Sequence, residues 1–142
     1  MAKVEAARGA QWPLVSEFSF RFDDTIEATD GVVKPLGGPI VADVINLPEG
    51  AVVIGGELVV EVPDATATTW TMSLGDSASA NRYGSAVSLK AAGRTALTLT
   101  GYRVSENLRA TIAQTGSAPT AGQVTVRVMF VMPGRANEVV PN

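Results

Sequence analysis

Apolar and polar residues alternate with a period of two along most of this chain, and no segment shows the three-to-four-residue spacing of an amphipathic helix. The pattern is clearest in residues 69–75, where Trp70, Met72 and Leu74 fall on one side of an extended strand and hydroxyl-bearing residues fall on the other. A strand of this kind buries one face and exposes the other. The alternation therefore predicts an all-β fold around one apolar core.

Seven segments carry the alternation, and clusters rich in glycine, proline, serine and aspartate separate them. They are residues 16–22, 39–47, 51–62, 69–75, 95–101, 108–113 and 123–132. The pair Gly55 and Gly56 predicts a bulge, a bend or a break within the third segment. About eight strands at this spacing, with no helix-length segments between them, predict a two-sheet β-sandwich of jelly-roll type.

Several local features refine this prediction. Leu97 and Leu99 have the spacing of residues that point inward from the strand that contains them. Residues 83–85 and 92–94 have the composition of turns. Only residues 89–92 are able to form a helical turn, so no helix is expected to contribute to the core.

The chain is expected to form one domain with two distinct ends. At 142 residues it buries enough surface to fold without disulfides or a structural metal. The alternation is missing at the beginning, and Pro133 and Gly134 end the last strand. We predict an extended N-terminal arm (residues 1–15), a β-sandwich domain (residues 16–132) and a C-terminal tail (residues 133–142). The two ends either extend as arms or fold back on the sandwich.

The chain contains no cysteine and no histidine, which excludes thiol chemistry, imidazole ligands and catalytic triads that depend on histidine. Gly75, Asp76 and Ser77 match the start of the nucleophile block of one class of esterases, but their serine has no base, so we predict a turn capped by Asp76. Paired carboxylates hydrolyse glycosides without histidine, yet no pair stands out among the fourteen acidic residues. We expect no enzymatic activity.

Clustered carboxylates in residues 23–30 have the chemistry to hold a hard cation, but their spacing matches no calcium-binding loop. We therefore predict no metal and no cofactor. The chain is acidic overall and has no basic run, which argues against a nucleic-acid partner. No apolar stretch is long enough to cross a membrane, and the first five residues lack an apolar signal core, so we expect no membrane partner.

Charge is distributed unevenly along the chain. Residues 1–64 contain eleven acidic and four basic residues, whereas residues 65–142 contain three acidic and seven basic residues. Arginine outnumbers lysine eight to three, which favours bidentate pairing with carboxylates. Either the two halves interleave in the fold and neutralise each other, or complementary patches meet between neighbouring subunits.

Several of these segments together resemble a known family. They are NLPEGAVVIGG (residues 46–56), TMSLGDS (residues 71–77), NRY (residues 81–83) and LKAAGRT (residues 89–95). In this succession the chain, over about residues 40–131, resembles the head decoration, or cement, proteins of tailed bacteriophages. The resemblance implies a non-enzymatic β-sandwich that coats the outer surface of the assembled capsid, cements neighbouring subunits of the major capsid protein, and acts as a homo-dimer or homo-trimer.

The resemblance also implies a location on the exterior of the virion capsid, with assembly in the host cytoplasm. The surface expected to contact the capsid or another subunit combines the apolar arm residues, which lack a periodic partner, with arginines and with the tail. These residues are Gln11, Trp12, Pro13, Leu14, Val15, Arg82, Tyr83, Arg94, Arg103, Val139 and Val140.

Two alternatives remain open from the sequence. One is a carbohydrate-binding or receptor-adhesion module on a virion, with Trp12, Trp70, Tyr83 and Tyr102 as an aromatic platform for sugar. Trp70 shares a strand face with apolar residues, so its position is explained more simply as that of a core residue. The other alternative is a structural component of the tail or baseplate.

Overall fold

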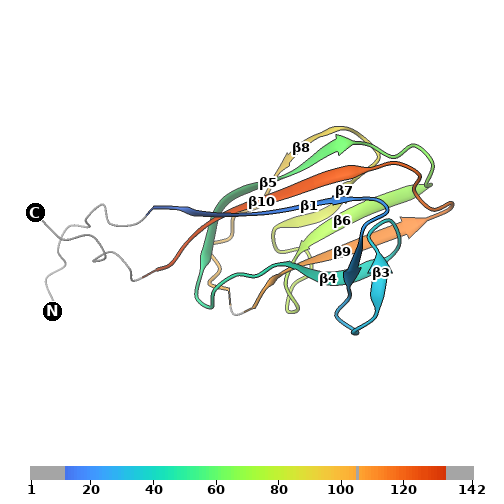
Figure 1. Cartoon of the computed structure of the whole chain (residues 1–142). Helices are drawn as coiled ribbons and strands as arrows, with labels where there is room; N and C mark the ends of the chain where they lie inside the picture. The colour runs from blue at the N-terminus through green and yellow to red at the C-terminus, as the bar shows by residue number, and fades with distance from the viewer. Residues whose placement is uncertain (1–11, 105, 134–142) are drawn as a thin grey trace, which may run out of the picture.

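The computed structural model describes residues 12–104 and 106–133. Every regular secondary-structure element within these residues is a β-strand (Figure 1). The strands are β1 (Leu14–Arg21), β2 (Thr25–Glu27), β3 (Val33–Pro35), β4 (Ile40–Ile45), β5 (Val52–Val62), β6 (Thr69–Gly75), β7 (Gly84–Ser88), β8 (Gly93–Ala96), β9 (Leu108–Thr115) and β10 (Gln123–Val131). No helix in the described part of the chain is long and apolar enough to cross a membrane.

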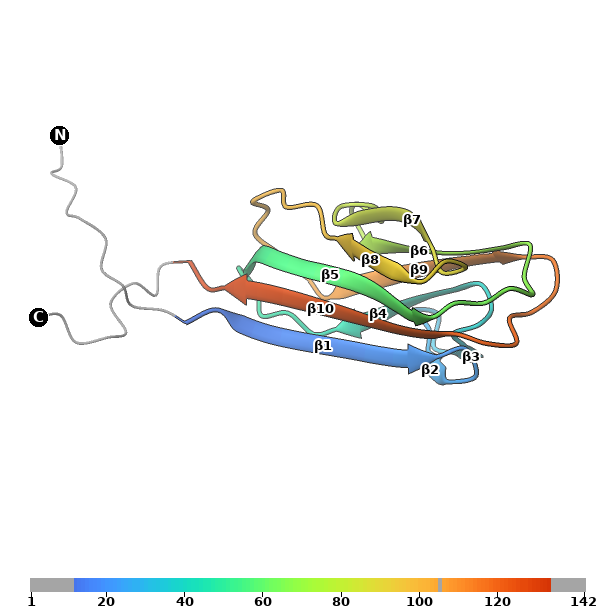
Figure 2. The same cartoon turned by 90° about the horizontal axis from the view of Figure 1, so that it is seen from above.

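Eight of these strands form two four-stranded antiparallel sheets, in the orders β1-β10-β5-β8 and β4-β9-β6-β7, and β2 and β3 form a separate hairpin. The pairing is nested, because β1 pairs with β10, β4 with β9, β5 with β8 and β6 with β7. The result is one long hairpin rolled into two layers, as Figures 1 and 2 show. This is the topology of a jelly roll, so the predicted fold class is confirmed.

The inner faces of the two sheets share one core. The predicted inward side of β6 is fully buried, at 0% exposure for Trp70, Met72 and Leu74. The opposite sheet contributes the alternate residues of β10, and Val124 and Val126 are also at 0% exposure. Burying a side chain of this size stabilises the fold by about 1.5–3 kcal/mol. The alternation in the sequence therefore identified the core faces of both central strands.

The edge strands were predicted less well. Residues 83–85 and 92–94 were expected to be turns, but Gly84 begins β7 and Gly93 begins β8. Both are edge strands, which take their hydrogen bonds from a long neighbour and need little pattern of their own. Strand β8 also ends at Ala96, so Leu97 is buried but Leu99 is 53% exposed, and the prediction that Leu99 points inward was wrong.

Two other local predictions have clear outcomes. Residues 89–92, which alone had the composition to form a helical turn, do not form one, because the N–H group of Leu89 donates to the Trp70 carbonyl and its own carbonyl accepts from Asp64. Of the bulge, bend or break predicted at Gly55 and Gly56, the structure shows a bulge beside Gly55, because Met129 of β10 pairs with Gly55 whereas Phe130 pairs with Val53. Gly56 has a φ of +151°, and a Cβ there would lie 2.5 Å from a backbone oxygen of β10.

The first strand begins earlier than expected. β1 starts at Leu14, and its first two residues, Leu14 and Val15, pair with Phe130 and Met129. These two residues therefore have strand partners, although the sequence showed no periodicity there. Residues 1–11 and 134–142 lie outside the described residues, so the extended arm and tail remain predictions.

Leu74 is buried and Leu99 is exposed, so the two leucines form a matched pair for a stability test. We expect Leu74→Ala to lower the free energy of unfolding by about 2–5 kcal/mol, because it opens a cavity in the core. Leu99→Ala removes the same atoms from an exposed side chain and should change this free energy by less than about 0.5 kcal/mol. Urea denaturation of both variants measures the difference, and equal losses would contradict the placement of Leu99 outside the core.

Candidate functional site at one end of the sandwich

One end of the sandwich gathers the beginning of β1, the end of β10 and the connections that follow β4, β6 and β8. Val52, at the start of β5, pairs with Val131 of β10 and also forms an isolated bridge with Arg103. Leu14 pairs with Phe130, the neighbour of Val131. We call this region the terminus end, because β1 starts and β10 finishes there, as Figure 2 shows.

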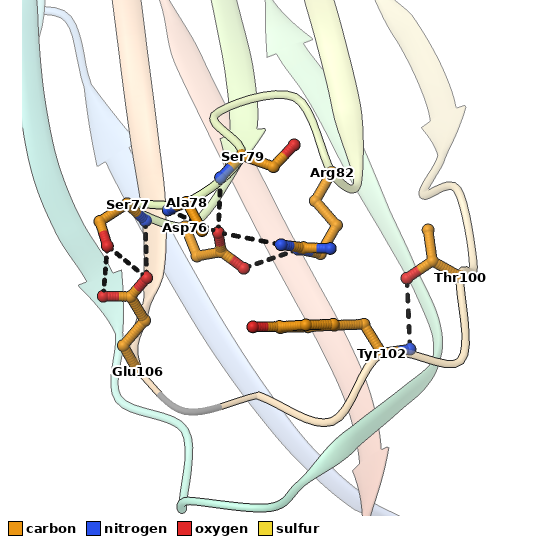
Figure 3. A network of polar contacts seen from close by, with 8 residues as sticks. All are labelled: Asp76, Ser77, Ala78, Ser79, Arg82, Thr100, Tyr102 and Glu106. Carbon is orange, nitrogen blue, oxygen red and sulfur yellow. Dashed lines mark hydrogen bonds and ion pairs between the residues drawn. The ribbon is translucent and has the colours of Figure 1, made fainter.

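The connection between β6 and β7 at the terminus end is organised by Asp76, which is only 3% exposed. Its Oδ1 atom accepts hydrogen bonds from the N–H groups of Ala78 (3.0 Å) and Ser79 (2.8 Å), as Figure 3 shows. Gly75 precedes it because a Cβ at that position would lie 2.1 Å from the Ser79 carbonyl oxygen. The predicted turn capped by Asp76 is therefore confirmed.

Arg82 ties this turn to the connection between β8 and β9. Its Nε donates to Asp76 Oδ2 at 2.7 Å, and its guanidinium carbon lies 3.5 Å from the centre of the Tyr102 ring (Figure 3). Burial by itself raises the pKa of the Asp76 carboxyl, but the hydrogen bonds from Arg82 and from backbone N–H groups outweigh it, so this pKa lies below its usual value. Arg82, expected at the interface, is thus already engaged within the chain.

Ser77 makes the second link between the same two connections. Its N–H group donates to Glu106 Oε1 at 2.8 Å, and its hydroxyl donates to Glu106 Oε2 at 2.7 Å (Figure 3). The hydroxyl therefore supports a loop and has no histidine to activate it. Sequence reasoning missed Glu106, and it named Tyr102 only as part of a possible sugar platform, because nothing in the pattern shows which connection lies beside the turn.

Tyr83 is the sequence-predicted site residue that does not reach the surface. It is 2% exposed, and burial raises the pKa of its hydroxyl. Its N–H group donates to the Leu74 carbonyl, and its own carbonyl accepts from Thr98, which fixes it beneath the terminus end. Because Trp70 is buried as well, two members of the expected aromatic sugar platform lie in the core.

The remaining described arginines explain the uneven charge. Arg127 of β10 bridges Glu17 (2.8 Å) and Glu57 (3.0 Å), and Arg94 also pairs with Glu57 on the outer face of that sheet. These pairs, and that of Arg109 with Asp43, join an acid from the first half to an arginine from the second. They support the interpretation that the two halves neutralise each other within the fold. Arg94 lies on the edge strand β8, opposite Val59 of β5, and away from the terminus end.

The terminus end still exposes an apolar and cationic surface. Trp12 is 85% exposed and Val15 is 61% exposed, and Pro13 and Leu14 are also exposed. Arg103 is exposed too, and among the arginines that the structure describes it alone has no carboxylate partner. We call the set Trp12, Pro13, Leu14, Val15 and Arg103 the terminus-end patch. Gln11, Val139 and Val140, also predicted, lie outside the described residues.

Three of the four carboxylates of residues 23–30, those of Asp23, Asp24 and Asp30, have partners near them in the chain. Asp24 accepts from the N–H group of Arg21 at 2.7 Å, and Asp30 accepts from Lys34 Nζ at 2.8 Å. Over residues 12–104 and 106–133, no group of three acidic side chains is arranged to hold a metal ion. The cluster shapes the turns that flank β2 and β3.

No protein-family model and no curated protein matches this chain. Solved structures do. A chain of the cyanophage Pam1 capsid asymmetric unit is 26% identical with a TM-score of 0.63, and the match covers 94% of both chains. A chain of the acid-stable capsid of Helicobacter pylori bacteriophage KHP30 is 17% identical with a TM-score of 0.60, covering 88% of this chain and 91% of that one. A chain of the Ralstonia phage GP4 capsid is 16% identical with a TM-score of 0.54, covering 93% and 90%.

These similarities extend over nearly the whole of each chain, so this chain and the matched chains have similar lengths and one shared fold. The jelly roll found here is thus a fold that occurs in chains of bacteriophage capsid structures.

The lowered pKa of Asp76 gives a prediction with a definite sign. A carboxyl whose pKa is lower in the folded state stabilises the fold above its ordinary pKa, and this stabilisation is lost as the pH falls through the folded value. At pH 7 we expect Asp76→Asn to lower the free energy of unfolding by about 1.5–3 kcal/mol. The gap between variant and wild type should shrink below about pH 4.

Urea denaturation at pH 7 and at pH 3 measures this gap. Asp23→Asn is the matched control, because Asp23 is exposed and its ion pair with Arg21 is long, at 3.6 Å. It should change the free energy of unfolding by less than about 0.5 kcal/mol at either pH. A gap for Asp76→Asn that stays constant with pH would contradict the role assigned to its charge.

Proposed function

We propose that this chain is a capsid decoration protein that binds the exterior of an assembled phage capsid and cements neighbouring subunits of the major capsid protein. The observation that carries the proposal is the similarity to a chain of the Pam1 capsid asymmetric unit over 94% of both chains. The residues that resemble decoration proteins, such as those of 71–77 and 89–95, support it independently of that match. Its partners are the major capsid protein and further copies of itself, and its place is the virion.

The architecture supports a role in holding rather than in catalysis. One rigid sandwich of this size offers a small contact surface, so each copy binds modestly, and many copies on a lattice add up to strong stabilisation. The ion pair of Arg82 with Asp76 and the hydrogen bonds of Ser77 with Glu106 stiffen the loops of the terminus end. Stiff loops lose little conformational entropy when they bind.

The terminus-end patch is the proposed contact with the capsid. Its exposed Trp12 has the large apolar area and limited flexibility that make tryptophan a frequent dominant residue of interfaces. Arg103 adds an unpaired cation with the geometry to bind a carboxylate bidentately. The sugar-binding alternative loses support, since Trp70 and Tyr83 are buried.

Co-sedimentation with assembled capsids tests the proposal. We expect saturable binding of the wild type at a fixed ratio to the major capsid protein. Trp12→Ala and Arg103→Glu should each weaken binding about tenfold or more, which corresponds to about 1.4 kcal/mol. The matched control is Lys90→Glu, because residues 89–92 connect β7 to β8 at the opposite end of the sandwich, and it should leave binding unchanged.

Three results would overturn the proposal. Wild-type protein that stays in the supernatant at every capsid concentration would remove the decoration role. Binding to cells or to glycans, with quenching of Trp12 fluorescence by sugar, would favour the adhesion module instead, and assembly into rings would favour a tail or baseplate component.

A further inference from the structure

The two sheets have four edge strands, and three of them are unsuited to pairing with another chain. β8 has only four residues. β7 is interrupted by a shift in register beside Ala86, whose φ of 46° lies in the left-handed region. β4 is partly covered, because its Val41 carbonyl accepts a hydrogen bond from Thr29. Short length, bulges and covering segments are the usual protections of a sheet edge.

β1 has none of these protections from Leu14 to Phe20, and a neighbouring segment occupies its edge groups only at Arg21. It is eight residues long and pairs with β10 without a shift in register from Leu14 to Arg21. Figure 2 shows it along the margin of its sheet, with β10 on one side only. A long and regular edge exposes a row of N–H and C=O groups that other strands can pair with. Among the described strands, β1 is the open edge of this fold.

The free backbone groups of β1 are identified by its neighbours. Phe22 donates its N–H group to the Gly122 carbonyl across from β1, so the alternation of an antiparallel ladder directs the even-numbered residues toward β10. The odd-numbered residues therefore direct their N–H and C=O groups to the open edge. At Arg21 both the N–H and the C=O group are already hydrogen-bonded to Asp24. The remaining set is Val15, Glu17 and Ser19.

We propose that this edge pairs with β1 of a second copy, antiparallel and about a two-fold axis that passes beside Phe18. This register places Glu17 opposite Ser19 of the second copy, so that each pair exchanges N–H···O=C bonds in both directions. A two-fold axis at Glu17 would oppose two glutamates, which is unfavourable. An axis at Ser19 would place Glu17 opposite Arg21, whose backbone groups are hydrogen-bonded to Asp24, and would leave only the Ser19 pair. The axis at Phe18 places only Val15, near the end of the strand, opposite Arg21, so Glu17 and Ser19 are the residues that pair.

Side chains at the edge suit the same register. Phe18 is half-buried, and its ring centre lies 5.7 Å from that of the buried Phe20, so Phe18 presents aromatic surface at the inner side of the edge. The proposed axis brings the Phe18 rings of the two copies together, and such aromatic pairs stabilise sheets. Glu17 is already balanced by Arg127 at 2.8 Å, so pairing buries no uncompensated charge there.

The assembly stops at two copies, because a two-fold contact uses the same edge of both copies and leaves neither β1 edge open. Antiparallel pairing also directs the two terminus ends in opposite directions along the joined sheet. Resting on the proposed function, this arrangement explains cementing: a dimer carries two terminus-end patches far apart and is able to bind two neighbouring capsid subunits.

The experiment uses the isolated full-length chain, without capsids. Analytical ultracentrifugation should show a concentration-dependent dimer. Ser19→Pro removes an edge N–H group that β10 does not use, and we expect it to sediment as a monomer at concentrations where the wild type is a dimer. Ser19→Ala is the matched control, since it loses only the hydroxyl contacts with Thr125 and Glu17 and keeps the backbone donor, so it should remain a dimer.

Amide exchange of the wild type, followed residue by residue by NMR, gives an answer even if Ser19→Pro does not fold. The amides of Glu17 and Ser19 should be protected in the dimer and exposed after dilution, whereas that of Phe18 should be protected in both. A monomer at all concentrations, a trimer, or a dimer in which the amides of Glu17 and Ser19 exchange freely would overturn the inference. If the chain is a monomer that binds capsids, the proposed dimer is wrong and the proposed function stands. If the chain is a dimer that does not bind capsids, the proposed function is wrong and the dimer stands.

Discussion

The pairing of β1 with β10 is the constraint on which the rest of the structure depends, because every other pair of the nested ladder lies inside it. It joins residues as far apart as Ser19 and Thr125, which are 106 positions apart and share a hydrogen bond of 2.8 Å. Closing so long a loop costs conformational entropy that only the buried faces of both sheets offset. The same pairing brings the start of β1 and the end of β10 together, which creates the terminus end.

The ion pairs follow from this topology. The row of Glu17, Arg127, Glu57 and Arg94 crosses strands β1, β10, β5 and β8, which the nested ladder places side by side. Each exposed pair contributes little stability in water, about 0–1 kcal/mol. Their larger effect is on the surface, because they neutralise the outer face of one sheet. Arg103 has no carboxylate partner among the described residues, so its charge is uncompensated at the end where an interface is proposed.

The sequence predicted the central strands far better than the edges. β6 and β10 are long and have one buried face, so apolar and polar side chains alternate along them. This alternation is recognisable from the sequence of each strand alone, without knowing which strand pairs with it. β7 and β8 were read as turns because short edge strands carry few buried residues. Tyr83 was taken as a contact residue, although it is buried, because a tyrosine beside an arginine and a glycine has no pattern that reveals its depth.

The candidate site was predictable only in part. Trp12 and Val15 were identified as exposed apolar residues, and they are exposed. Arg82 and Arg103 were indistinguishable in the sequence, since both are arginines in connections between strands. The structure separates them, because Arg82 meets Asp76 and Tyr102 while Arg103 meets no carboxylate among the described residues.

By itself, the sequence determined that this protein is built from strands, which faces of the long central strands are buried, and that chemistry based on histidine or cysteine is excluded. These properties are local, since they depend on the spacing and type of neighbouring residues. Only the tertiary structure decided which strands pair, which arginines are neutralised and that β1 is an open edge. Each of these depends on contacts between residues far apart in the chain, and the period of two is the same whichever strand lies alongside.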